Sequence, residues 1–215
     1  MAFVKTDAQE ALVARFNSFD EARETLVSLE MPTEKRIQAA HYIIRHQEFY
    51  SLLEILQTAF NQDREADHPV VDYIFSQLPV KPSRDQDYQL LFALLQSDNA
   101  YLRNAVIHFL QTYEQGLRPY LEALFQKADR DVRIFIVNIL GDMRLEASTE
   151  ILHSFIAQEV ANQKDINVIM TAVDYLGEIG TEQDIALLEA VKQEFASEPY
   201  VAFGVEMAIN RIKGV

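Results

Sequence analysis

Apolar residues recur along this chain at spacings of three and four positions, which is the pattern of helices that bury one face. The segment that starts at Val132 is an example, with apolar residues at offsets 0, 4, 7, 8 and 11 from that position. Six glycines and six prolines interrupt the chain, and the alternation typical of strands is hard to find. The pattern predicts an all-α protein.

The same apolar stripe returns about six times, so this helix is one copy of a repeat. Strong copies also begin at Leu102, Val168 and Val201, and weaker ones begin at Lys35 and Val70. Successive starts lie 30 to 36 residues apart, a period typical of stacked helical hairpins. Three positions before five of these starts stand Asp67, Asn99, Asp129, Asp165 and Glu198. The first four are residue types that we expect to cap a helix.

Each of these second helices has a partner in the intervening sequence, and the pairs must stack to share one core. We expect second helices near residues 35–46, 70–78, 102–113, 132–143, 168–179 and 201–212. We expect first helices at 49–60, 85–95, 117–125, 148–159 and 181–195. Residues 1–32 would form an N-terminal cap and first outer helix, with helices around 7–16 and 20–29, and the longer loops would be 61–69 and 78–87.

Residues 165–180 also resemble a known repeat. Asp165, Val168, Ala172 and the Leu176-Gly177 pair stand where the HEAT-like repeat of phycobilisome lyases has its Asp, Val, Ala and Leu-Gly. Residues 129–141 and 99–110 are similar, and the resemblance is strong over residues 98–212 and weaker over 33–97. Since no linker divides the chain, we predict one domain over residues 1–215. Its fold would be an all-α, right-handed α-α superhelix (solenoid) of about six HEAT-like hairpins.

The resemblance also implies roles for polar residues beside the stripe. Arg103 and Arg133 resemble rungs that pair with the capping acid of a neighbouring repeat, and Asp129 and Asp165 stand where such rungs would reach. A ligand-binding role for these arginines is the alternative to a structural ladder.

A binding surface is expected on the side of the second helices that faces away from the core. At 100° per residue, offset 2 lies nearly opposite the stripe, and offset 6 lies close to it. Large apolar residues stand at offset 2 in four copies, namely Ile37, Ile134, Met170 and Phe203. Neighbours at offset 6 are Asn138, Asp174 and Met207. An exposed apolar strip with a polar rim usually marks a contact site, although a curved stack could instead bury offset 2 against neighbouring helices.

The composition narrows the class of partner. The chain of 215 residues is 49% hydrophobic and carries a formal net charge of −14, which repels phosphate backbones. There is no cysteine, and neither a secretory signal nor a membrane-spanning apolar run is present in the sequence. We expect a cytoplasmic protein that binds neither nucleic acid nor membrane.

No motif in the sequence indicates metal binding or catalysis. The five histidines lack metal-ligand spacing, with His41 and His46 five positions apart, and there is neither a phosphate loop nor a Gly-x-Ser-x-Gly turn. We therefore expect no metal, no cofactor and no catalytic residue.

The function that fits these observations is a non-enzymatic scaffold or adaptor, whose concave surface binds another protein. The alternative, which the resemblance implies, is a bilin-lyase-like protein or a factor that assembles phycobiliproteins. A helical-repeat glycosylase is disfavoured by the acidity and by the absence of tryptophan. The identity of the partner and the oligomeric state stay open.

Overall fold

The computed structural model describes residues 16–46, 49–77, 85–112, 117–143 and 148–215. These residues form helices and no strand, which confirms the predicted all-α class. The chain divides into two compact units, residues 1–109 and 110–215, and each is considered by itself. The prediction of one domain stays a prediction, and the expected helix at 7–16 and most of the expected loop at 78–87 lie outside the described residues.

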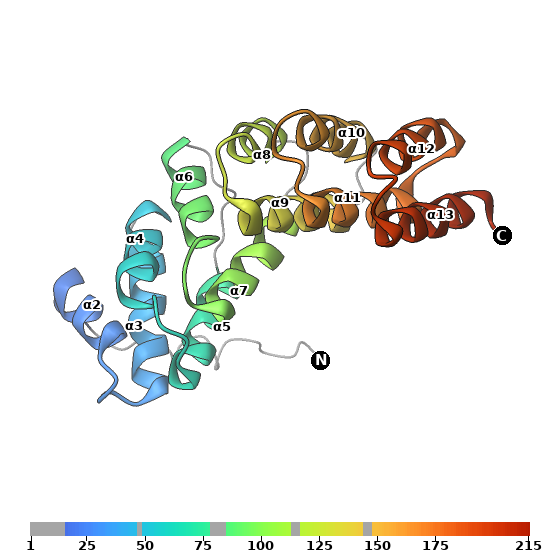
Figure 1. The fold of residues 1–215 in the computed structure, drawn as a ribbon. Coiled ribbons are helices and arrows are strands. Elements are labelled where there is room, and N and C mark those ends of the chain that lie inside the picture. The colour runs from blue at the N-terminus through green and yellow to red at the C-terminus, as the bar shows by residue number, and fades with distance from the viewer. Residues whose placement is uncertain (1–15, 47–48, 78–84, 113–116, 144–147) are drawn as a thin grey trace, which may run out of the picture. The chain divides into compact units, whose positions relative to one another are not determined.

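Unit 1 consists of helical hairpins, as expected. Its first helices are α2 (Phe19–Val27), α4 (Phe49–Ala59) and α6 (Asp85–Leu94). Its second helices are α3 (Thr33–His46) and α5 (His68–Gln77), which the turn η1 (Glu65–Asp67) precedes, and α7 (Ala100–Gln111), which crosses the boundary between the units. Helix α3 packs on α2 and α5, and α4 packs on α6 (Figure 1).

Unit 2 has the same organisation, with two layers of helices that are visible in Figure 1. The first helices are α8 (Arg118–Phe125), α10 (Ser148–Gln158) and α12 (Ile185–Glu194). The second helices are α9 (Arg130–Met143), α11 (Ile166–Ile179) and α13 (Pro199–Lys213). The π-helical turn η3 (Glu159–Gln163) follows α10, and the 3-10 turn η4 (Glu182–Asp184) precedes α12.

The predicted stripe forms the core. In α9, the stripe residues Val132, Ile136, Ile139 and Leu140 are at most 2% exposed, since the apolar face of the helix is turned towards its neighbours. The weaker first copy keeps the predicted register, because Ala39 and Ile43 at offsets 4 and 8 are fully buried. Lys35 is exposed, whereas the neighbouring Arg36 is buried.

Helix starts are capped as expected in three repeats. The side-chain oxygens of Asn99 and Asp129 accept from the backbone N–H groups of Leu102 (3.0 Å) and Val132 (2.9 Å). Asp165 caps α11 in the same way, through Asn167 N–H at 3.0 Å. At the start of α13, the Glu198 side chain makes no capping hydrogen bond. Proline in the first turn, with φ already helical, favours the start of α13 instead.

Glycines let the second helices of unit 2 approach closely. Gly141 of α9 lies against the ring of Tyr175 in α11, and Gly177 of α11 lies against Ala208 of α13. Both glycines occupy offset 9 of their repeats, and both of the residues that cover them occupy offset 7. The Leu-Gly element of the repeat therefore marks a site where the following second helix packs.

Candidate protein-binding surface

The residues predicted to form an apolar strip differ in their exposure. Along α9, α11 and α13, Ile134 is half-buried, Met170 is 3% exposed and Phe203 is 65% exposed. In unit 1, Ile37 is half-buried. The expectation that Met170 is exposed is therefore wrong, and the residues do not form one continuous exposed strip.

Met170 is buried because the following second helix covers it. The terminal methyl group of Met170 packs against Gly204 of α13. A Cβ atom at that position would collide with the methyl group. Gly177, seven residues further along α11, lies under Ala208 of the same helix. Offsets 2 and 9 are thus on the side of α11 that receives α13.

Helix α13 leaves the equivalent side exposed in the part of the chain that the structure describes. Phe203 occupies the same offset as Met170, Met207 is 41% exposed, and Tyr200 is 60% exposed. Spacings of three and four positions place these three side chains on one stripe, which we call the α13 face. Tyr200 was missed at the level of sequence because it precedes the start of the repeat register, although its spacing from Phe203 is helical.

Polar residues line the edge beside this stripe. Asn138 is half-buried and Asp174 is exposed, with its carboxylate 4.0 Å from the guanidinium of Arg211. Asp142 accepts hydrogen bonds from Gln111 Nε2 at 2.6 Å and from the Tyr175 hydroxyl at 2.9 Å. Polar groups of successive second helices are therefore tied to one another along this edge of unit 2.

A buried ion pair joins α3 to the turn η1. In unit 1, Arg36 donates through Nε to the Leu26 carbonyl (2.9 Å) and through Nη2 to Asp67 Oδ1 (2.5 Å). The other oxygen of Asp67 accepts from Arg64 Nε at 2.7 Å. Since Arg36 and Asp67 are 2% and 0% exposed, one buried carboxylate serves two guanidinium groups.

The two arginines predicted as rungs of a ladder each donate to a nearby backbone carbonyl. Arg103 donates to the Ser97 carbonyl at 2.5 Å, and Arg133 donates to the Ala128 carbonyl at 2.8 Å. The acidic partner of Arg133 is Glu159 of η3, with Nε and Oε1 2.7 Å apart, whereas Asp165 uses its carboxylate to cap α11. Glu159 in turn accepts from the Asp165 backbone N–H at 3.3 Å.

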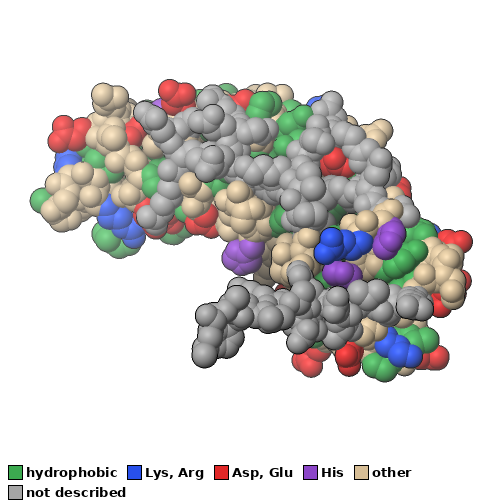
Figure 2. All heavy atoms as spheres, turned by 180° about the vertical axis from the view of Figure 1, so that it is seen from behind, with side chains coloured by type: hydrophobic (Ala, Val, Ile, Leu, Met, Phe, Trp, Pro, Cys, Tyr) green, Lys and Arg blue, Asp and Glu red, His purple; other side chains and the backbone are tan. Residues whose placement is uncertain are grey.

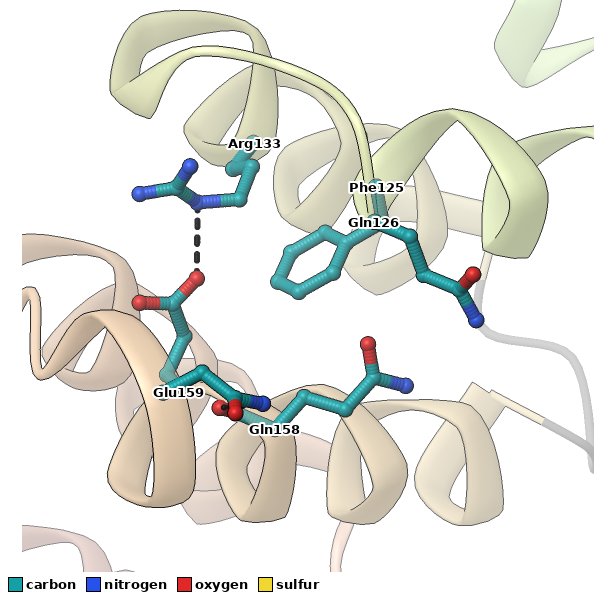
Figure 3. Close-up of a pocket in the computed structure, with 6 residues that line it drawn as sticks. Phe125, Gln126, Arg133, Gln158 and Glu159 are labelled. Carbon is teal, nitrogen blue, oxygen red and sulfur yellow. Dashed lines mark hydrogen bonds and ion pairs between the residues drawn. The ribbon is translucent and has the colours of Figure 1, made fainter.

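The Arg133–Glu159 pair lies beside a cavity of about 540 Å³ (Figure 3). The remaining lining residues are Phe125, Gln126, Gln158 and Asn162. Burial raises the pKa of Glu159 above its ordinary value, and Arg133 opposes that rise. Among the described residues, the lining holds neutral amides, one aromatic ring and the Arg133–Glu159 ion pair.

The histidines interact with other residues of the protein. His41 Nδ1 lies 2.6 Å from the Tyr73 hydroxyl, His68 Nε2 lies 2.7 Å from Asp63 Oδ1, and His153 Nε2 lies 2.5 Å from Asp184 Oδ1. Histidine and basic side chains lie near one another on the part of unit 1 seen in Figure 2. Over the described ranges, no group of three or more His, Asp or Glu side chains could hold a metal ion.

Unit 1 should lose stability as the pH falls through the range in which histidine titrates. Burial, followed by the charges of Arg45 and His46, lowers the pKa of His41 from its ordinary value of 6.5. The unfolded chain then takes up a proton more readily than the folded one, so acidification favours unfolding. We expect His41→Gln to reduce the loss of unfolding free energy between about pH 7.5 and about pH 5.5 in urea titrations. An equal loss in both proteins would contradict this assignment.

A family model for HEAT repeats matches residues 117–198, so this part of unit 2 is similar to HEAT repeats. With the helical hairpins of both units, the match supports an all-α, HEAT-like fold. The match is to HEAT repeats in general and does not single out the phycobilisome-lyase type. No curated protein matches the chain. None of the described helices has the length and apolar character needed to cross a membrane.

Proposed function

We propose that this chain is a non-enzymatic protein-interaction scaffold, which contacts another protein through the α13 face. HEAT-like repeats commonly mediate such interactions, because stacked hairpins present extended surfaces. The observation that carries the proposal is the exposure of Tyr200, Phe203 and Met207 on one stripe of a well-formed helix. Such a stripe is unfavourable in water unless another apolar surface covers it.

The composition of the α13 face suits a protein partner. Tyr and Phe supply large rigid surfaces with few rotatable bonds, and aromatic and methionine side chains are enriched at interfaces. The helix also carries Glu206, Arg211 and Lys213, so charged groups border the apolar stripe. An apolar centre with a charged border is the usual arrangement of a specific interface.

Replacing Phe203 by aspartate should remove partner binding and leave the fold intact. Because Phe203 is 65% exposed, its loss opens no cavity, whereas a buried carboxylate in the interface would be left unpaired. We expect capture of the partner from the native cell, identified by mass spectrometry, to fall at least about tenfold. Unchanged circular dichroism and thermal unfolding would show that the variant is folded.

Leu29→Asp is the matched control, since Leu29 is 51% exposed in unit 1 and the change in charge is the same. Proteins captured by the wild type and by Leu29→Asp, and lost with Phe203→Asp, would support the proposal. Equal capture by all three proteins would rule out the α13 face as the contact surface.

A further inference from the structure

The arginine beside the cavity in unit 2 is bonded differently from its counterpart in unit 1. Arg36 and Arg133 both occupy offset 1 of their repeats. All three guanidinium nitrogens of Arg36 donate to protein oxygens, the third of them to Asp67. Arg133 donates through Nη1 to the Ala128 carbonyl, and its Nε lies 2.7 Å from Glu159 Oε1. Its Nη2 forms no hydrogen bond with the residues that the structure describes, so one repeat position holds a fully bonded arginine in unit 1 and a partly bonded one in unit 2.

A guanidinium nitrogen without an acceptor is costly at this depth. Arg133 is 8% exposed and Glu159 is 1% exposed, so the ion pair has little contact with solvent. A buried donor that loses its hydration without gaining an acceptor destabilises the fold. The adjoining cavity of about 540 Å³ is within the size range of small-molecule sites. An oxygen atom of a ligand in this cavity would supply the missing acceptor.

The backbone beside the cavity is irregular as well. The π-helical turn η3 provides two of the lining residues, Glu159 and Asn162. It ends at Lys164, whose φ of 53° lies in the left-handed region that favours glycine. Turns and residues of these kinds are uncommon, and they occur preferentially near functional sites. Ligand binding in the cavity would account for this irregular backbone.

The lining also limits the chemical class of the ligand. The ion pair places one positive and one negative charge at the cavity, so its net charge favours neither an anion nor a cation. Three carboxamides complete the polar lining, and groups of this kind both donate and accept hydrogen bonds: Gln126, Gln158 and Asn162. The amide nitrogens of Gln158 and Asn162 donate to Ser154 Oγ and to the Gln158 carbonyl, which leaves their side-chain oxygens as acceptors for a ligand.

We infer that the cavity binds a neutral amide group, whose oxygen accepts from Arg133 Nη2 and whose N–H groups donate to the lining oxygens. An amide combines the acceptor that Arg133 lacks with donors for the carboxamide oxygens. The Gln158 carboxamide points towards the ring of Phe125 (Figure 3), so an apolar part of the ligand can contact this ring. The site is separate from the α13 face and does not depend on the proposed function.

Three probes of similar size test this inference, because they differ mainly in charge. Benzamide is neutral, benzoate is an anion and benzamidinium is a cation. In NMR titrations of the full chain labelled with ¹⁵N, benzamide should bind with a Kd of about 1–10 mM and shift the backbone signals of residues 158–162. Both charged probes should bind at least about tenfold more weakly. No saturable shift with benzamide up to about 50 mM, or equal or tighter binding of a charged probe, would overturn the inference.

Two variants test the contacts. Arg133→Lys keeps the positive charge beside Glu159 but removes Nη2, so the affinity for benzamide should fall at least about tenfold. Gln158→Leu changes a half-buried side chain and should weaken binding about three- to tenfold with the fold intact. Gln193→Leu is the matched control, since Gln193 is exposed on α12 and should be replaced without effect. Unchanged affinity in both cavity variants, or an equal loss in the control, would overturn the inference; circular dichroism checks that each variant is folded.

A fourth probe distinguishes two sources of the amide. Tighter binding of N-acetylglutamine methylamide than of benzamide would assign the group to a glutamine side chain of a protein, and the reverse order would assign it to a free small molecule. Phe203→Asp should bind benzamide as the wild type does. Loss of a cellular partner in that variant, with benzamide binding unchanged, would therefore report on the α13 face alone.

Discussion

Replacing Asp67 by asparagine is expected to lower the free energy of unfolding by about 3–5 kcal/mol. The Asp67 carboxylate is fully buried and accepts from Arg36 at 2.5 Å and from Arg64 at 2.7 Å. Asparagine keeps the shape but turns one acceptor into an NH₂ donor, which then faces a guanidinium group. The variant also leaves the buried charge of Arg36 without its counterion, which is the costly half of breaking such a pair.

Urea unfolding of the purified chain, followed by circular dichroism, measures this loss. The matched control is Asp63→Asn, because Asp63 is 43% exposed and forms a surface pair with His68 at 2.7 Å. We expect at most about 1 kcal/mol of change in that variant. Similar effects of both substitutions would mean that Asp67 is not the buried counterion described here.

Replacing Gly177 by alanine is expected to destabilise unit 2 by about 1–3 kcal/mol. A Cβ atom at this position would lie 2.9 Å from the Cα and 3.0 Å from the Cβ of Ala208. Since the Cα atom belongs to the α13 backbone, relief requires the two helices to separate. This cost exceeds the gain of about 1 kcal/mol that alanine brings to a helix interior.

Gly204→Ala is the control for this prediction. Its new methyl group would meet the terminal methyl of Met170, which can move by rotation of a flexible side chain. We expect unfolding midpoints close to or above that of the wild type for Gly204→Ala, and lower midpoints for Gly177→Ala. Equal midpoints in the two variants would show that helix separation is not the source of the cost.

The repeat register could be predicted because it depends on local periodicity. Val132 and Val168 mark stripes that are buried as expected, since each helix needs only an apolar side to find its neighbours. Met170 shows where this reasoning ends. Its exposure depends on Gly204 in the following helix, and the periodicity of one helix gives no information about which residue of a neighbouring helix packs against it.

The polar contacts were harder to predict for a similar reason. Asp67 was expected to cap a helix, whereas its carboxylate lies between Arg36 and Arg64, which are 31 and three positions away. Glu159 could not be predicted as a partner of Arg133, because it reaches Arg133 through a π-helical turn that has no simple sequence signature. The roles of Ile37, Ile134, Asn138 and Asp174 in binding remain predictions.

The hydrogen bond between Asp142 and Tyr175 has a mechanical consequence. It ties α9 to α11 at 2.9 Å on the edge beside the stripe, so a change of curvature there must break it. Between α11 and α13, the Asp174 carboxylate lies 4.0 Å from the Arg211 guanidinium, and Gly177 lies against Ala208. A bending motion of unit 2 that opens this edge would therefore have to break a direct tie between two neighbouring second helices.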